Sequence, residues 1–441
     1  MYTTTTNILE FQIFDVNSRT GFMPFQPPIS RLPTHWELWE SLLDDARREQ
    51  LQPADKLGIT AEEMARSERW RSRVSQTPLL SINDMATSTV LLRRAHLVLT
   101  FLMHFYIHTI PPDSPVLIPR PISIPILQVA KVLDLPPVIT FSDTVLYNWR
   151  WANNANESDS SLESQTLFTG LQDEEVFYLC SARIELRGVD ALNIMCSVMD
   201  EIFCGDEITL GRLTTYLLEL STVIDALKSL LLDVRKGCDP EVYYNAVRPW
   251  FRGEDSDSYV PSEERRKWVF EGAEEYPDLN MLPPDRELSG ASAGQSSLIH
   301  ALDVFLGVDH DRPNSISYMK RMQRYMPHPH RCFLSHLGKN PRPLRDFVMT
   351  ACSEDTPANS AMKEAYNKAV SSLKEFRDSH MVIAGLYIIG PARRAAEALV
   401  HDTSVSSSAS LKDRAITGTG GTDLLSFLKG VKKQTVLTLI T

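Results

Sequence analysis

One histidine lies within an apolar helical stripe in the last fifth of the chain. In the segment 361–389, apolar residues recur every three or four positions, and His380 falls among them, one turn from Phe376 and from Ile383. This spacing is typical of a helix that buries one face. A neutral imidazole on such a face can ligate haem iron, because the porphyrin needs an apolar slot and one basic nitrogen. A core histidine bonded to a neighbouring carbonyl is the commoner origin of the pattern, so spacing alone leaves both interpretations open.

An arginine among aromatic residues is the next candidate. Tyr244 and Arg248 lie one helical turn apart, and Tyr243 is beside them. A guanidinium can hold a carboxylate through two parallel hydrogen bonds while aromatic rings hold a flat apolar body. An arginine that extends its charged end from an aromatic core to water would leave the same pattern. The pattern therefore leaves two alternatives open, a carboxylate-binding site and an aromatic core from which the arginine reaches water.

Two weaker signals accompany these. Phe177, Ser181 and Ile184 share one face of a predicted helix and could line a pocket. The glycine-rich run 418–422 does not match the G-x-G-x-x-G pattern of dinucleotide-binding proteins. It also lacks the Lys-Ser/Thr pair that ends a Walker motif. Its glycines favour a mobile lid over a pocket.

The paired histidines are better explained by structure than by metal binding. His104 and His108 lie one turn apart, but the segment lacks the glutamate of an H-E-x-x-H motif and shows no third ligand. We expect them to pack in the core. His328 and His330 flank a proline, which predicts a turn that joins two helices.

Helices must position these residues, because helical periodicity dominates the chain and alternating strand patterns are scarce. Thr60 and Glu63 form a capping box that predicts a helix start. Polar tracts at 153–165 and 402–422 predict loops or boundaries. The sequence predicts an all-α protein with a small amino-terminal domain, hinge included, over 1–160 and a larger helical domain over 161–441. The expected helices cover 36–48, 60–74, 91–110, 126–133, 174–204, 209–236, 240–250, 292–306, 317–326 and 357–389.

Composition excludes several classes of protein. The 441 residues are 43% hydrophobic and 23% charged, so the chain can bury a large core and is not wholly disordered. With 45 Lys and Arg against 56 Asp and Glu, the net charge is −11, which argues against nucleic acid or an anionic membrane as the main partner. Six dispersed cysteines without a C-x-x-C pair argue against disulfides and thiolate zinc. With no secretory signal visible and the apolar window 96–110 too short to span a bilayer, we expect a cytoplasmic protein.

Several short stretches, taken in their order along the chain, match the sequence pattern of a known protein family. The matching stretches are SAGQSS (292–297), DVFLGV (303–308), MQRYMPHPHRCFL (322–334), RDFV (345–348), EAYNKAV (364–370), FRDSH (376–380) and GTGGTDLLSFLK (418–429), with GFMPFQPP and LDLPPVITFSDTVLYNW upstream. In this order and spacing the chain resembles the indoleamine 2,3-dioxygenase family along most of its length, with fungal-type members in particular.

The resemblance implies an all-helical fold that holds haem b in the large domain. It implies a reaction in which both atoms of O2 are inserted across the C2–C3 bond of an indole, so that L-tryptophan gives N-formylkynurenine. This product would enter the kynurenine pathway and NAD biosynthesis. An electron donor would keep the iron ferrous. His380 falls at the position of the proximal iron ligand, and Arg377 matches a residue that pairs with a haem propionate.

The same resemblance implies roles for the residues of the pocket. Ser181 would lie on the distal side, with Phe177 and Phe141 at the reacting indole. No general base is needed there, because the electron-rich indole itself reacts with the oxygen. The expected substrate-binding residues are Arg248 for the carboxylate, Tyr243, Tyr244, Ser292, Ala293 and Thr419.

Departures from the family pattern keep other functions open. Animal members carry two phenylalanines where this chain has Tyr243 and Tyr244, and a tyrosine where it has Phe141. These substitutions change the expected polarity of the pocket. A buried hydroxyl must then find a partner, because it costs about 1 to 3 kcal/mol when unpaired. The alternatives are a paralogue that oxygenates another indole or secondary metabolite, and a haem-binding sensor with little turnover.

Overall fold

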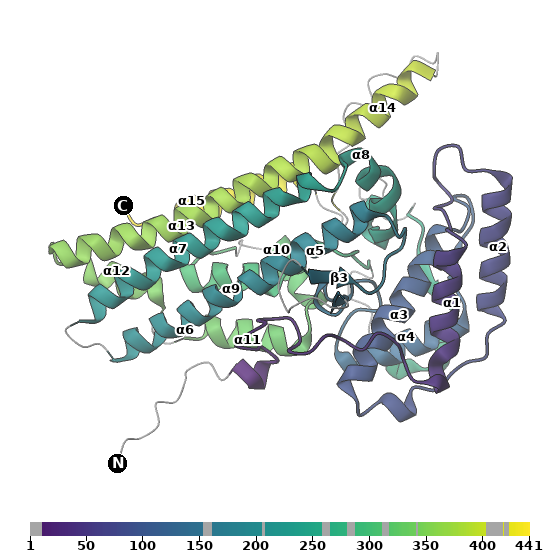
Figure 1. Cartoon of the computed structure of the whole chain (residues 1–441), viewed down its shortest axis with the longest axis horizontal. Helices are drawn as coiled ribbons and strands as arrows, with labels where there is room; N and C mark the ends of the chain where they lie inside the picture. Colours follow the sequence, from purple (N-terminus) through teal and green to yellow (C-terminus); the bar gives the residue numbers. More distant parts are fainter. Residues whose placement is uncertain are drawn as a thin grey trace.

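The computed structural model describes residues 11–152, 161–204, 208–257, 265–279, 287–310, 317–340, 343–402, 418 and 423–441. Helices dominate it, as expected, and the described strands are short. An elongated bundle of long helices lies beside a smaller group of helices from the amino-terminal part (Figure 1).

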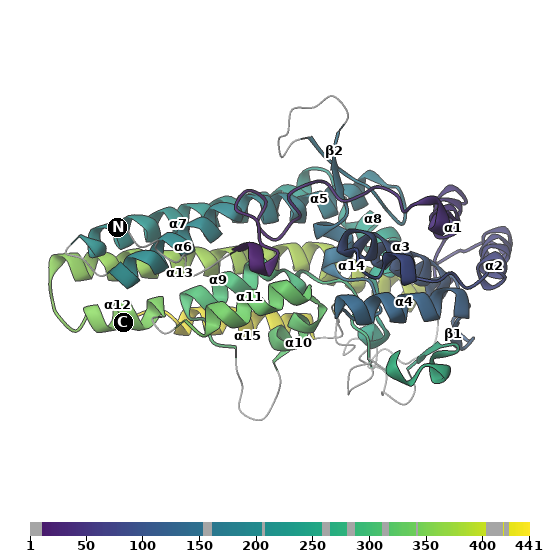
Figure 2. The ribbon, with the colours of Figure 1, turned by 90° about the horizontal axis from the view of Figure 1, so that it is seen from below.

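The bundle is built on two long helices that lie side by side in both views, α7 (Thr209–Asp233) and α13 (Pro357–Ala384) (Figures 1 and 2). Against them pack α5 (Gln172–Arg187), α6 (Val189–Cys204) and α15 (Leu424–Leu437). The apolar stripe predicted for 361–389 is buried, as Tyr366, Leu373 and Phe376 show. The bundle therefore buries the face of α13 that carries His380.

The smaller helices of the bundle cover one side of it. They are α9 (Ser297–Leu306), α10 (Tyr318–Met322), α11 (His328–Gly338) and α12 (Leu344–Ala351). Helix α11 packs against α9, and α12 against α13. The predicted turn at His328 and His330 is wrong, because both residues lie in the first turn of α11. Pro329 causes no break there, since the first positions of a helix need no internal N–H donor.

The amino-terminal helices form the second group, namely α1 (Glu37–Arg48), α2 (Ala61–Ser75), α3 (Thr89–His108) and α4 (Arg120–Leu133). The capping box is confirmed: the Thr60 hydroxyl accepts from the Glu63 N–H, and the Glu63 carboxylate accepts from the Thr60 N–H. The apolar window 96–110, expected to be too short to span a bilayer, lies mostly within α3, and the whole of α3 is long and apolar enough to cross a membrane. However, 83% of its most apolar stretch is buried, as in the core helix of a folded domain.

Short strands tie distant segments together. Strand β1 (Val116–Ile118) pairs in parallel with β4 (Trp268–Phe270), with Val116 opposite Trp268. Strands β2 (Trp149–Trp151) and β3 (Leu162–Ser164) form an antiparallel pair. Most of the polar tract predicted as the domain boundary falls between β2 and β3, outside the described residues, and the division at 160 stays a prediction.

Two expected helices change course at a glycine. The segment 174–204 divides at Gly188, where Leu298 of α9 packs closely: a Cβ at Gly188 would lie 2.2 Å from a Leu298 methyl. The segment 357–389 changes at Gly385 into a π-helical turn, η14 (Gly385–Ile389), and continues as α14 (Gly390–Asp402), which projects from the bundle (Figure 1). Helical periodicity does not report such changes of winding.

The predicted helix 240–250 is also replaced by tighter and wider turns. It consists of α8 (Pro240–Val242), a π-helical turn η7 (Tyr243–Val247) and a 3-10 turn η8 (Arg248–Phe251). Pro249 cannot donate a backbone hydrogen bond, which is consistent with the change of winding at this point. As a result, Tyr244 and Arg248 are not on a regular helical face.

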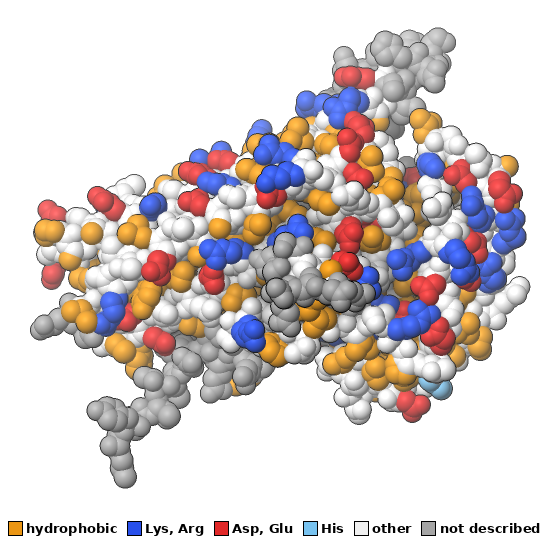
Figure 3. Space-filling view, in the orientation of Figure 1, with side chains coloured by type: hydrophobic (Ala, Val, Ile, Leu, Met, Phe, Trp, Pro, Cys, Tyr) orange, Lys and Arg blue, Asp and Glu red, His pale blue; other side chains and the backbone are white. Residues whose placement is uncertain are grey.

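Charged side chains are interspersed on the face of the molecule shown in Figure 3. On the amino-terminal helices they form ion pairs, such as Arg73 with Glu49 and Arg69 with Glu62 at 3.0 Å. Exposed pairs of this kind add little stability. They do balance the local charge on this surface.

Candidate active site

Two adjoining cavities lie inside the bundle, between α5, α13, α15 and the segment that precedes α9. The first has an empty volume of about 780 Å³ and the second about 960 Å³. The residues that line both are Phe141, Ser181, Ala293, Gly294, His380 and Phe427. The cavities therefore meet around His380.

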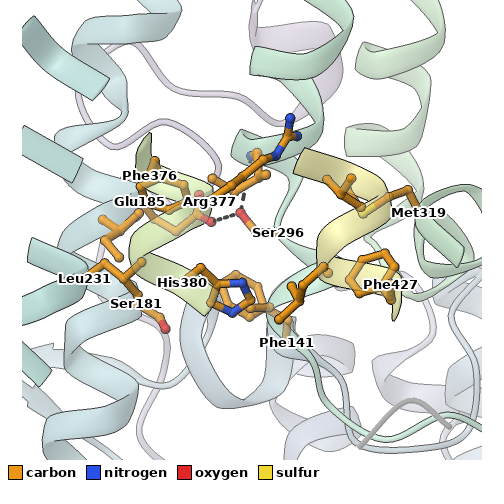
Figure 4. Close-up of a pocket in the computed structure, with 16 residues that line it drawn as sticks. Phe141, Ser181, Glu185, Leu231, Ser296, Met319, Phe376, Arg377, His380 and Phe427 are labelled. Carbon is orange, nitrogen blue, oxygen red and sulfur yellow. Dashed lines mark hydrogen bonds between the residues drawn. The ribbon is translucent and has the colours of Figure 1, made fainter. Parts of the chain in front are cut away.

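The imidazole of His380 faces this space (Figure 4). It makes no hydrogen bond within the part of the chain that the structure describes, whereas His300 nearby has its Nε2 2.9 Å from the Gly294 carbonyl oxygen. Burial, assisted by the charge of Arg377, lowers the pKa of His380 to about 4. A neutral imidazole with a free nitrogen in an apolar cavity fits the requirement for a haem iron ligand.

Arg377 lies one turn before His380 and is buried. Its guanidinium forms an ion pair with Asp303 of α9 and donates to the hydroxyl of Thr435 on α15. Burial raises the pKa of Asp303, but the Arg377 and His310 charges outweigh burial and lower it overall. The arginine thus ties three helices together at the cavity wall. The predicted contact of Arg377 with a haem propionate stays a prediction.

The residues predicted for the reacting centre are brought together. Ser181 lines both cavities, and Phe177, one turn earlier on α5, lines the second. The ring of Phe177 lies 4.4 Å from that of Tyr243, centroid to centroid. Phe141 is positioned by its backbone N–H, which donates to Gln295 Oε1 over 2.8 Å. Aromatic walls of this kind suit a flat apolar ligand.

The substrate-binding set predicted from the sequence is only partly assembled. Tyr243, Ser292 and Ala293 line the second cavity. Tyr244 and Arg248 line neither cavity. Instead, the Arg248 guanidinium carbon lies 5.4 Å from the centre of the Tyr244 ring.

The second cavity has two further features near this set. Thr419 lies outside the described residues, although Gly418 beside it lines the second cavity. The hydroxyl of the buried Tyr243 makes no hydrogen bond to the residues described, and burial raises its pKa. The second cavity therefore carries a polar group on an aromatic wall.

Sequence reasoning missed one acidic residue of the site. Glu185 lies one turn after Ser181 on α5, lines the first cavity and is 1% exposed. Its Oε1 accepts from the Ser296 hydroxyl over 2.6 Å (Figure 4), and its Oε2 is buried with no hydrogen-bond partner in the part of the chain described. Burial, opposed by the Ser296 hydrogen bond, raises the pKa of Glu185 to about 7. The four-residue spacing from Ser181 was a signal that could have identified it.

The paired histidines lie against backbone carbonyl groups. The Nδ1 of His104 lies 2.8 Å from the Trp250 carbonyl oxygen, and the Nε2 of His108 lies 3.1 Å from that of Arg252. Burial lowers the pKa of His104 to about 4. The expectation of core packing is confirmed. Across the described ranges, no group of three or more His, Cys, Asp or Glu could hold a metal ion.

Fold and site define a helical protein whose apolar cavity presents a neutral imidazole that no described residue binds, as a porphyrin-binding cavity does. Comparisons with known proteins agree with this class. The profile of the indoleamine 2,3-dioxygenase family matches residues 10–438. The chain therefore belongs to the indoleamine 2,3-dioxygenase family, whose members are haem oxidoreductases, and it is an enzyme of the haem dioxygenase class.

Individual relatives match over nearly their whole length. Indoleamine 2,3-dioxygenase of Saccharomyces cerevisiae is 31% identical over 96% of this chain and 92% of its own. Indoleamine 2,3-dioxygenase acdA of Aspergillus candidus is 30% identical over 96% of each chain. Indoleamine 2,3-dioxygenase 2 of Mus musculus is 28% identical over 97% of this chain and 95% of its own. The similarity thus covers both groups of helices.

Proposed function

We propose that the protein is a haem b dioxygenase that converts L-tryptophan and O2 to N-formylkynurenine, in the kynurenine pathway and NAD biosynthesis. The observation that carries the proposal is the neutral imidazole of His380, which has no hydrogen-bond partner among the described residues and lies between two cavities with apolar and aromatic walls. The family membership supports the reaction class. We place the activity in the cytoplasm, with an electron donor that keeps the iron ferrous.

The residues around the cavities would each supply part of the binding and orientation. His380 would bind the haem iron, and the Arg377–Asp303 pair would hold the helix that carries this histidine. Ferrous haem, when bound, supplies the binding and activation of O2. Phe141 and Phe177 would hold the indole ring and exclude water, which protects a ferrous centre from oxidation.

The polar end of the substrate would be held at the rim of the second cavity. Arg248 would bind the carboxylate, with Ser292, Ala293 and Thr419 nearby. In the structure Arg248 lies on the ring of Tyr244, so its guanidinium would have to turn toward the cavity to reach a ligand. A charge-assisted hydrogen bond contributes about 1.5 to 3 kcal/mol, enough to favour that change on binding.

A second candidate function is oxygenation of an indole other than tryptophan. The buried hydroxyl of Tyr243 on the wall of the second cavity, which bonds to no described residue, favours it. A hydroxyl in such a place stabilises a ligand that offers a hydrogen-bonding atom and disfavours one that does not. The two candidates differ only in the substrate.

An absorbance spectrum and a product assay test the proposal. Purified protein reconstituted with hemin should show a Soret band, and with a reductant, O2 and L-tryptophan it should form N-formylkynurenine, identified by mass spectrometry. Product from another indole but not from tryptophan would support the second candidate. Protein that stays colourless after reconstitution would contradict both, and O2 binding without any oxygenated product would indicate a haem sensor.

A further inference from the structure

A cysteine, a histidine and an aspartate form a chain of contacts on the surface, away from the cavities. The Sγ of Cys332 lies 3.3 Å from Nε2 of His328, and Nδ1 of His328 lies 2.7 Å from Oδ2 of Asp134. The histidine and aspartate side chains are about half exposed, at 54% and 52%, and Cys332 is partly exposed. Small solutes can therefore reach the cluster.

Two elements that are distant in the sequence build this cluster. Asp134 caps the end of α4 in a left-handed conformation, with φ of 51°. His328 begins α11 and Cys332 follows one turn later, so their side chains lie on the same face. Arg331 fastens the two elements together, since its guanidinium donates to the Asp134 carbonyl oxygen over 3.0 Å and to the Asp134 carboxylate.

The order of the contacts decides the direction in which a proton can move. Nδ1 of His328 lies 2.7 Å from Oδ2 of Asp134 and 3.1 Å from a guanidinium nitrogen of Arg331. The carboxylate is the closer of the two groups and can only accept a hydrogen bond, so we assign the proton to Nδ1. Nε2 is then the basic nitrogen and faces the Cys332 thiol. The same order of nucleophile, histidine and orienting carboxylate activates the nucleophile in hydrolases.

The other cysteines lack this arrangement. Cys180 donates to the Leu230 carbonyl oxygen and Cys352 lies near that of Asn359, so each meets only an acceptor. Burial raises the pKa of Cys196 and of Cys238 to about 12. Cys204 is exposed at the end of α6, and no base contacts it in the described structure. Among the six, Cys332 alone has an imidazole within reach of its sulfur in the part of the chain described.

We propose that Cys332 is a covalent modification site that takes small disulfides, with His328 as its base and Asp134 as the residue that orients the base. Sγ attacks one sulfur of the disulfide and the thiol proton passes to Nε2. A protein mixed disulfide forms, the S–S bond of the reagent breaks, and its leaving thiolate takes the proton from His328. The cysteine is oxidised and half of the reagent is reduced to a thiol. An adduct there would alter the contact between α4 and α11.

The rate of reaction at each cysteine tests this proposal. The intact protein, haem-loaded or not, is incubated with oxidised glutathione at neutral pH, and modification is followed by peptide mass spectrometry. We expect Cys332 to react about tenfold faster than Cys204, although Cys204 is the more exposed, because only Cys332 has a base. A rate at Cys332 equal to or below that at Cys204 would overturn the proposal.

Two variants separate activation from exposure. His328→Ala opens access to the sulfur but removes the base, so the rate at Cys332 should fall to that of Cys204, while the rate at Cys204 stays unchanged. Asp134→Asn keeps a residue that tolerates the left-handed conformation and should slow the reaction less. An unchanged rate at Cys332 in His328→Ala would also overturn the proposal. None of these outcomes depends on the proposed dioxygenase activity.

Discussion

Arg377 and Asp303 form a buried ion pair that joins α13 to α9, one turn from the histidine of the site. Both side chains are almost wholly enclosed, at 8% and 3% exposure. Thr435 of α15 and His310 provide the remaining contacts of this pair. The position of His380 therefore depends on a polar network inside an otherwise apolar bundle.

Removal of one partner of this pair should destabilise the protein strongly. Asp303→Asn leaves the Arg377 charge buried without a counter-charge, and we expect a loss of about 3 to 5 kcal/mol in the free energy of unfolding, measured by urea denaturation. Because Asp303 has a lowered pKa in the folded state, its contribution is present above about pH 4 and is lost as pH falls through that lowered value. An Asp303→Asn variant as stable as the parent would show that the pair contributes nothing.

Glu185 should make stability fall as pH rises. Its pKa is raised to about 7 in the folded protein, so between about pH 4.5 and 7 the unfolded chain releases the proton while the folded chain keeps it. The resulting cost at pH 8 is roughly 3 kcal/mol. Haem-free Glu185→Gln should avoid that cost, so its unfolding free energy should rise relative to wild type between pH 5 and pH 8. Parallel pH profiles for the two proteins would refute this assignment.

His380→Gly should abolish haem binding without unfolding the protein. The variant loses the only unpartnered imidazole that faces the described cavities, so hemin titration should give no Soret band, while circular dichroism stays close to wild type. Added imidazole, which fits the space left by the side chain, should restore a haem spectrum. The exposed His35→Gly serves as the control. Full haem retention in His380→Gly would exclude the ligand assignment.

Arg248→Ala should weaken tryptophan binding. If Arg248 holds the substrate carboxylate, its loss should raise the Kd about 10- to 150-fold, measured by spectral titration of the haem-loaded protein. Arg248→Lys should recover part of the affinity, because it keeps the charge and loses the forked geometry. In Tyr244→Phe the ring beneath the guanidinium remains, so the affinity should change little. Unchanged tryptophan binding in Arg248→Ala would show that Arg248 packs on Tyr244 and does not bind the substrate carboxylate.

The sequence by itself determined the features that depend on local order along the chain. Periodicity is enough to predict the buried stripe that contains His380, and the Thr60–Glu63 spacing is enough to predict a helix start. Ordered motifs spread over the chain indicated the family, which the comparisons confirm. These features could be predicted because they involve neighbours in the sequence or residue identities alone.

The tertiary structure decided which side chains are enclosed and which distant groups meet. The partner of Arg377 is 74 positions away, and Asp134 is 194 positions from His328. No spacing rule brings such residues together. Glu185 follows the face of Ser181, but only the packing of α5 against the segment before α9 buries its carboxyl group and raises its pKa. Burial and long-range pairing are properties of packed helices, and the order of residues within one helix does not contain them.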